Sequence, residues 1–207
     1  MTVVAAIGLA AVCHPAMAGN LLVNGHFEEP VVTGTEWDFT GTVSFAGWSA
    51  FSTGNGGNAG IDVGIHYGLG PSDGNQYFSF NGLNPPAGTY LEQTFITIKG
   101  VQYTVAFDIG RNNGVFDQYL ALDVQAFDSA SGHLLANEEA LPPSTTGWSQ
   151  ASMTFTADSG LSRLRFTDIS GDNPNTDVSL DNVTVVPEPV TLSLLALGGL
   201  ALMRRRR

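Results

Sequence analysis

QYTVAFDI, residues 102–109, alternates large apolar side chains with polar or small ones along its whole length. The alternation places four large side chains on one face of an extended chain: Tyr103, Val105, Phe107 and Ile109. A period of two is typical of a β-strand with one face on a hydrophobic core and the other in solvent. We therefore expect a half-buried strand here.

Similar runs lie on both sides of this segment. Residues 163–168 alternate Leu164 and Phe166 with Arg163 and Arg165 on the opposite face. Gly, Pro, Asn and Asp clusters separate the runs, and residues 19–186 show no sustained helical periodicity. About ten short strands in a segment of this length predict an all-β fold, a jelly-roll β-sandwich. The remaining clear runs occupy residues 90–98, 119–128, 148–157 and 179–186.

The central segment is strongly acidic. Residues 19–186 contain four Lys and Arg against 18 Asp and Glu, a net charge of −14. Such a surface repels nucleic acid, whereas neutral sugars and Ca²⁺, which prefers oxygen ligands, are compatible with it. A simpler interpretation is that the charge keeps an exported protein soluble. Cys13, the only cysteine, lies outside this segment, so the central domain has neither a disulfide nor a thiol nucleophile.

Residues 1–18 are typical of a secretory signal peptide. An apolar run is followed by Ala16-Met17-Ala18, whose small alanines suit the pocket of signal peptidase. We expect cleavage between Ala18 and Gly19. No Lys or Arg precedes the apolar run, which leads us to expect a natural start upstream of Met1.

The C-terminal residues have three parts in a fixed order. Pro187-Glu188-Pro189 is followed by an apolar segment, residues 190–203, and by Arg204, Arg205, Arg206 and Arg207. As a hydrophobic helix, the segment spans roughly 21 Å, which is shorter than the ~30 Å core of a bilayer. We therefore expect it to anchor the chain only transiently in the inner membrane, with the arginines in the cytoplasm.

This tripartite end resembles the PEP-CTERM sorting signal. The resemblance implies recognition by exosortase, a membrane protease, and export to the cell surface, outer membrane or medium. The alternative is an ordinary tail-anchored protein. The chain then divides into a signal peptide (1–18), a β-sandwich domain (19–186) and a sorting signal (187–207).

The central domain carries a second set of motifs. Residues 20–28 read NLLVNGHFE, and residues 180–185 read LDNVTV. In order and spacing the set resembles galactose-binding-like jelly rolls, which include many carbohydrate-binding modules, and the choice-of-anchor surface proteins. The resemblance implies fold and location more firmly than a ligand. Five shorter motifs complete it: GW at 47–48, ID at 61–62, DGNQY at 73–77, EQTF at 92–95 and YTVAF at 103–107.

The resemblance also implies a structural Ca²⁺ that ties the first strand to the last, with Glu28 and Asp181 as its ligands. The apolar parity shifts between Leu180 and Val183, which predicts a bulge that re-aims the Asp181 side chain. The alternative is that Glu28 is a solvated turn residue and Asp181 caps a loop.

We expect no catalytic residues. The histidines of the central segment are His26, His66 and His133, which lack the spacing of a zinc site, and neighbouring acids on a strand point to opposite faces. Exposed aromatic rings would carry sugar binding, because sugar C–H faces stack on them. Trp37 is the leading ligand-binding candidate, followed by Tyr67 and Tyr77, with Tyr90 and Trp148 as further candidates.

Together these features predict an exported, exosortase-sorted surface or matrix protein that binds extracellular polysaccharide and is not an enzyme. Its partners during export are signal peptidase and exosortase. Two alternatives remain, a hydrolase of surface glycan and a structural or adhesive protein without a small ligand.

Overall fold

The alternating runs form strands, as the sequence predicts. The computed structural model describes residues 19–52, 59–80, 88–112, 119–171 and 176–188, within which twelve strands form. Residues 19 and 187–188 are the described parts of the predicted cleavage site and sorting signal; Ala16, Ala18, Pro189 and the four arginines lie outside. The strands are β1 (Glu36–Phe39), β2 (Gly41–Phe45), β3 (Trp48–Ser52), β4 (Ala59–Val63), β5 (Gln76–Ser79), β6 (Tyr90–Ile96), β7 (Gln102–Arg111), β8 (Leu122–Asp128), β9 (Leu134–Ala140), β10 (Gly147–Thr156), β11 (Leu161–Asp168) and β12 (Val178–Pro187).

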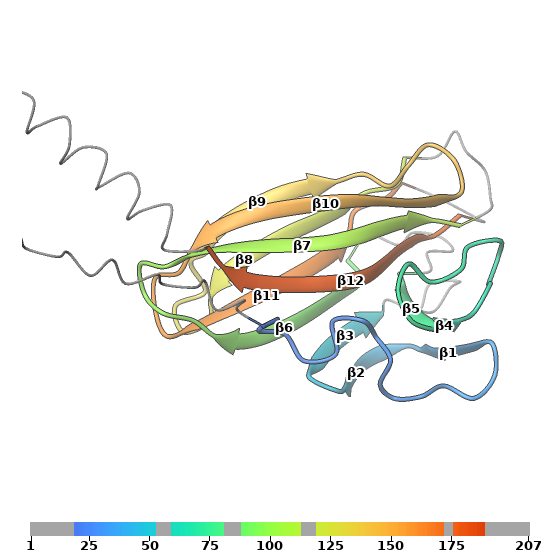
Figure 1. The fold of residues 1–207 in the computed structure, drawn as a ribbon, viewed down its shortest axis with the longest axis horizontal. Helices are drawn as coiled ribbons and strands as arrows, with labels where there is room; N and C mark the ends of the chain where they lie inside the picture. Colours follow the sequence, from blue (N-terminus) through green and yellow to red (C-terminus); the bar gives the residue numbers. More distant parts are fainter. Residues whose placement is uncertain (1–18, 53–58, 81–87, 113–118, 172–175, 189–207) are drawn as a thin grey trace, which may run out of the picture. The chain divides into compact units, whose positions relative to one another are not determined.

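Two antiparallel sheets of six strands build the fold (Figure 1). Sheet A has the order β1-β4-β5-β12-β7-β10, and sheet B has the order β2-β3-β6-β11-β8-β9. Asn20–Glu188 is one compact unit. The predicted all-β jelly-roll sandwich is confirmed. No helix among the described ranges combines the length and the apolar character needed to cross a membrane.

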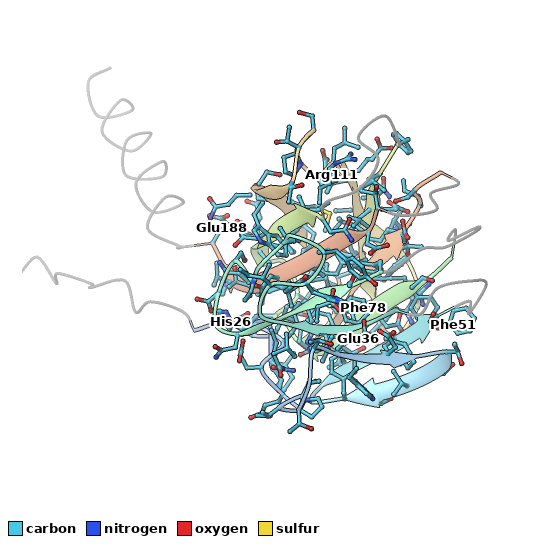
Figure 2. All side chains as sticks on the ribbon, turned by 90° about the vertical axis from the view of Figure 1, so that its right-hand side faces the viewer. His26, Glu36, Phe51, Phe78, Arg111 and Glu188 are labelled. Atoms are coloured by element: carbon cyan, nitrogen blue, oxygen red, sulfur yellow. The ribbon has the colours of Figure 1, made fainter. Side chains whose placement is uncertain are left out.

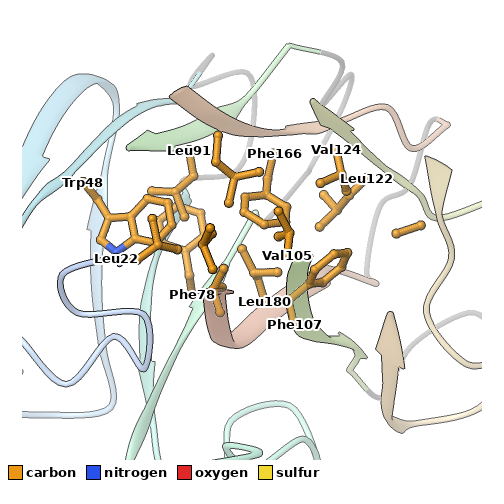
Figure 3. Packing of buried hydrophobic residues seen from close by; sticks show 14 of the residues in the cluster. Leu22, Trp48, Phe78, Leu91, Val105, Phe107, Leu122, Val124, Phe166 and Leu180 are labelled. Carbon is orange, nitrogen blue, oxygen red and sulfur yellow. The ribbon is translucent and has the colours of Figure 1, made fainter. Parts of the chain in front are cut away.

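The core lies between the inner faces of the two sheets (Figure 3). The four alternating side chains of residues 102–109 are all buried, as expected from their period. Trp48 is also buried, and its indole nitrogen donates a hydrogen bond to the Asn24 carbonyl at 2.9 Å. Arg163 and Arg165 lie on the outer face of β11, opposite the buried Leu164 and Phe166.

The predicted irregularity in the last strand is present. The register of β12 against β7 shifts between Asp181 and Thr184, because a bulge interrupts the ladder. The N-terminal segment runs along this strand: Val183 donates its amide to the Gly25 carbonyl at 2.8 Å, and Leu21 donates to Val185 at 3.0 Å. A Cβ at Gly25 would lie 2.0 Å from the Val183 oxygen, so only glycine fits there.

Three local features differ from what the sequence pattern indicates. The Gly/Asn-rich stretch 54–60 predicts a loop without core residues, but Ala59 and Gly60 belong to β4 and Ala59 is fully buried. The Thr- and Gly-rich surroundings of Trp37 also predict a loop, but Trp37 lies in β1. Strand β9 was not anticipated, since Glu138 and Glu139 interrupt its apolar pattern; it is an edge strand, where such charges are common.

Candidate functional site

The outer face of sheet B gathers aromatic and charged side chains into a row across four strands. Phe51 on β3 pairs with Tyr90 on β6, Glu92 on β6 pairs with Arg165 on β11, and Arg163 on β11 pairs with Phe127 on β8. Four neighbouring strands span about 14 Å. We call this set the aromatic platform: Phe51, Tyr90, Glu92, Phe127, Arg163 and Arg165.

The platform rings are held by one another and by the arginines. Phe51 and Tyr90 stack with ring centroids 5.6 Å apart. The Arg165 guanidinium lies 4.4 Å from the centre of the Tyr90 ring, and that of Arg163 lies 5.1 Å from the centre of the Phe127 ring. Cation–π contacts of this kind fix both partners. All three rings remain partly exposed, and Figure 2 shows Phe51 at the periphery of the fold.

Glu92 joins the two arginines. Arg165 donates to the Glu92 carboxylate from Nε at 2.7 Å and from the terminal nitrogen at 2.6 Å. Arg163 Nε lies 3.5 Å from the same oxygen and makes no hydrogen bond with the described residues. The Arg165 guanidinium is therefore hydrogen-bonded within the platform, whereas the Arg163 side chain, 29% exposed, is held less closely by the same carboxylate.

A hollow of about 480 Å³ adjoins the platform. It lies where the turn between β2 and β3 meets β6, and Glu92 borders both the hollow and the platform. A concave surface beside partly exposed rings is the form that small-molecule and sugar sites take. The lining residues run from Ser44 to Ser49 and from Glu92 to Thr94.

A second hollow, of about 380 Å³, lies on the outer face of sheet A. Asp108, Gln150, Ser152, Asn182 and Thr184 provide its polar lining. Its one aromatic lining residue, Phe107, is turned into the core and only 3% exposed. This hollow can form hydrogen bonds but offers no ring for stacking.

The structure separates the three predicted ligand-binding rings. Tyr77 is 1% exposed, packs edge-on against Trp148, and its hydroxyl donates to the Leu69 carbonyl at 3.2 Å. The expectation of an exposed ring at Tyr77 is therefore wrong, because the loop after β4 folds over it. Trp37 is partly buried and packs edge-on against Phe45 of the core. Tyr67 is 60% exposed, but its ring lies against His66. It belongs to the loop between β4 and β5 of sheet A, whereas the platform lies on sheet B.

The carboxylates of Glu28 and Asp181 both accept hydrogen bonds from main-chain amides at the loop between β4 and β5. Asp181 is fully buried, and its Oδ2 accepts the amides of Ser72 and Asp73 at 2.9 and 3.0 Å. Glu28 Oε1 accepts the amides of Asn75 and Gln76 at 2.6 and 2.9 Å. N–H donors compete with a cation for these oxygens, so the arrangement fits Ca²⁺ poorly. Calcium at Glu28 and Asp181 stays a prediction.

The described part of the predicted sorting motif continues strand β12. Pro187 pairs with Tyr103, and the Glu188 amide donates to the Gln102 carbonyl at 2.8 Å. The Glu188 carboxylate accepts a hydrogen bond from the Thr104 hydroxyl. The motif therefore begins within the folded sheet.

No family model and no curated protein matches this chain. The solved structures with a similar fold include the following two. One is a carbohydrate-binding module, TmCBM61, solved in complex with β-1,4-galactotriose; it is 15% identical, with a TM-score of 0.54 over 82% of this chain and 99% of the module. The other is the enzymatically active domain of tailspike protein 4 of bacteriophage CBA120, 14% identical, with a TM-score of 0.53 over 81% of this chain and 21% of the tailspike chain. At these identities the likeness shows the jelly-roll sandwich alone.

Sequence reasoning missed most of the platform. Phe127 lies on the face of its strand opposite the buried apolar side chains. Phe51 and Tyr90 occupy the same kind of position in β3 and β6. An aromatic residue on the polar face of an alternating strand was the available signal. Tyr90 was named as a minor candidate, while Phe51, Phe127 and the arginines were not.

Proposed function

We propose that this protein binds polysaccharide on the aromatic platform of sheet B. The observation that carries the proposal is the set of three partly exposed rings interleaved with two arginines on one sheet face. The fold shared with a sugar-bound module supports it. It extends the sequence-based prediction of carbohydrate binding and moves the site to different residues.

The chemistry of the platform suits a sugar chain. The C–H face of a pyranose packs against an aromatic ring, and its hydroxyls need fixed donors and acceptors nearby. Tyr90, Phe51 and Phe127 supply rings, Glu92 supplies an acceptor, and the partly exposed guanidinium of Arg163 supplies donors. Because four strands span about 14 Å, the face accommodates more than one sugar unit.

Replacing Tyr90 with Ala should weaken binding to polysaccharide at least tenfold, which corresponds to about 1.4 kcal/mol. The ring contributes stacking area and orients the Arg165 guanidinium. Affinity electrophoresis in gels that contain β-1,4-galactan, xylan or polygalacturonate measures the loss. Circular dichroism checks that the variant keeps its β-rich spectrum.

Tyr67→Ala is the matched control, because it removes a more exposed tyrosine outside the platform. Loss of binding in Tyr67→Ala, with Tyr90→Ala unchanged, would overturn the platform in favour of the residue chosen from sequence. The hydrolase alternative is separated in the same samples: release of reducing sugar from a bound polysaccharide would show turnover. If the protein binds none of the three polysaccharides, the result would favour a structural role.

The proposal places this binding outside the cell. Signal peptidase releases the chain at Gly19, and exosortase reads Pro187, Glu188 and Pro189 while residues 190–203 hold the chain transiently in the inner membrane. The final site is the cell surface, outer membrane or medium. This part of the proposal rests on the sequence resemblance of the two ends.

Changing Glu188 to Ala should leave most of the chain unprocessed, because it removes the charged residue of the sorting motif. The readout is the mass of the mature protein from wild-type cells and from cells without exosortase. Thr104→Val is the control: it removes the hydroxyl that donates to Glu188 but keeps the motif. Equal processing of Glu188→Ala and wild type would refute the sorting role, and a defect in Thr104→Val alone would assign the effect to the folded strand.

A further inference from the structure

Three metal-binding side chains meet at the edge of sheet A. Glu36 on β1 and Asp62 on β4 are directly opposite each other in the strand pairing, so both carboxylates leave the same face. His66 follows in the turn after β4. Its Nδ1 lies 2.9 Å from Asp62 Oδ1, and its Nε2 lies 3.5 Å from Glu36 Oε2. One ligand atom from each residue lies within 4.8 Å of the others.

The imidazole is held in place before any ligand arrives. His66 and Leu69 exchange two main-chain hydrogen bonds of 2.9 Å each, which close the turn. The Tyr67 ring lies against the imidazole at 4.2 Å, and the Tyr77 hydroxyl donates to the Leu69 carbonyl below it. Asp62 is 7% exposed and His66 only partly exposed, so two of the three groups are shielded from water.

The local charge is unbalanced. Two carboxylates opposite each other on adjacent strands repel, and such pairs destabilise a sheet unless a positive group lies between them. Asp38, also on β1, and Asp177 add their negative fields to Asp62. The imidazole can offset one charge only when protonated, which leaves the cluster negative.

We propose that Glu36, Asp62 and His66 bind one divalent transition-metal ion, of the zinc or manganese class. An imidazole nitrogen with carboxylate oxygens suits these ions, whereas Ca²⁺ prefers a shell made of oxygen alone. The ion takes the place of a proton on one ring nitrogen of His66, which must be unprotonated to ligate. It fastens β1, the edge strand of sheet A, to the turn that covers Tyr77.

This site is independent of the aromatic platform, which lies on the other sheet. It also differs from the predicted calcium site, since neither Glu28 nor Asp181 belongs to it. The two proposals can therefore fail separately.

The test is a titration of the chelator-treated, purified protein with Zn²⁺, Mn²⁺ and Ca²⁺ by calorimetry, with Co²⁺ as a spectroscopic probe of nitrogen ligation. We expect Zn²⁺ or Mn²⁺ to bind with one ion per chain and more tightly than Ca²⁺. His66→Ala should weaken that binding at least 100-fold. Affinity should fall on acidification, because a protonated imidazole cannot ligate a metal.

His133→Ala is the matched control. His133 also contacts a carboxylate, Asp158, at 3.0 Å, but this pair belongs to no three-residue set within the described residues. If His66→Ala does not fold, Glu36→Gln replaces it, because the Glu36 side chain is 42% exposed and tolerates the change. Equal binding in wild type, His66→Ala and Glu36→Gln, an equal loss in His133→Ala, or tighter binding of Ca²⁺ would each overturn the proposal.

Discussion

Replacing Asp181 with Ala is expected to lower the free energy of unfolding by about 3–5 kcal/mol. The carboxylate is fully buried, and its two oxygens accept three main-chain amides, from Ser72, Asp73 and Asn182. Removing the acceptor leaves these donors without a partner, at about 1–3 kcal/mol for each one that stays buried. The variant should melt about 10 °C lower than wild type, as measured by thermal unfolding.

Asp108→Ala is the control for this result. Asp108 pairs with Asp181 across β7 and β12, but among the described residues its Oδ2 accepts side-chain donors alone, from Ser72 and Asn182 at 2.8 and 3.2 Å. Those donors can turn toward water, so the loss should be about 1 kcal/mol. Equal destabilisation of the two variants would show that the amide contacts of Asp181 contribute no more to the free energy of unfolding than the side-chain contacts of Asp108.

The same unfolding curves test calcium. If Glu28 and Asp181 share an ion, a hundredfold excess of Ca²⁺ over its Kd stabilises wild type by about 2.7 kcal/mol, or roughly 5–11 °C. The Asp181→Ala variant should then lose this response, and chelator should reverse it in wild type. Identical curves with Ca²⁺ and with chelator would leave the amide contacts as the sole link between the two carboxylates and the loop.

Acidification from pH 7 to pH 5 is expected to stabilise the fold, by about 1 kcal/mol for each fully buried carboxyl group. Burial is the main cause that raises the pKa of several aspartates from 3.8 to about 6. The gain should raise the melting temperature by roughly 5–10 °C at constant ionic strength, measured with chelator present. The aspartates are Asp62, Asp168 and Asp181, which are all buried.

The direction follows from proton binding. Between about pH 4 and pH 6 the folded chain holds protons on these carboxyl groups that the unfolded chain has released, so stability falls as the pH rises through 6. Asp128 acts in the opposite direction, because the Ser131 hydrogen bond lowers its pKa to about 2. Its contribution is present above about pH 4 and is lost only in stronger acid.

Asp168→Asn separates the stabilisation by buried aspartates on acidification from the effect of a general change in net charge. The amide keeps an oxygen that can accept the Ser170 amide, at 2.9 Å in the wild type, but it does not titrate. The variant should therefore show a shallower rise on acidification. A melting temperature that falls between pH 7 and pH 5 would contradict the assignment of raised pKa values.

Local pattern predicted the clearly alternating strands, β6, β7, β8, β10, β11 and β12, and their buried faces. The alternation at residues 102–109 and 163–168 was sufficient, because side chains on a strand alternate between faces regardless of which strand lies beside it. The shift of apolar parity at Asp181 likewise predicted the bulge observed there. The ends of the chain were interpreted from motifs alone, and their roles remain predictions.

Neighbouring positions across strands could not be predicted in this way. Phe51 and Tyr90 are 39 residues apart, and Arg163 meets Phe127 only because β11 pairs with β8. Pairing and register depend on the whole set of strands, and a shift of one residue would exchange the buried and exposed faces. Tyr77 shows the same limit, because its burial depends on a loop that closes over it.

The sequence by itself determined that this chain is an acidic, all-β domain with Arg163 and Arg165 on an outer face, because composition and a period of two are local properties. Tertiary structure alone decided that these arginines lie beside Tyr90 and Phe127, and that Glu36, Asp62 and His66 converge. The reason is that hydrophobic burial specifies which face of each strand turns inward, while hydrogen bonding between distant strands specifies which outer side chains become neighbours.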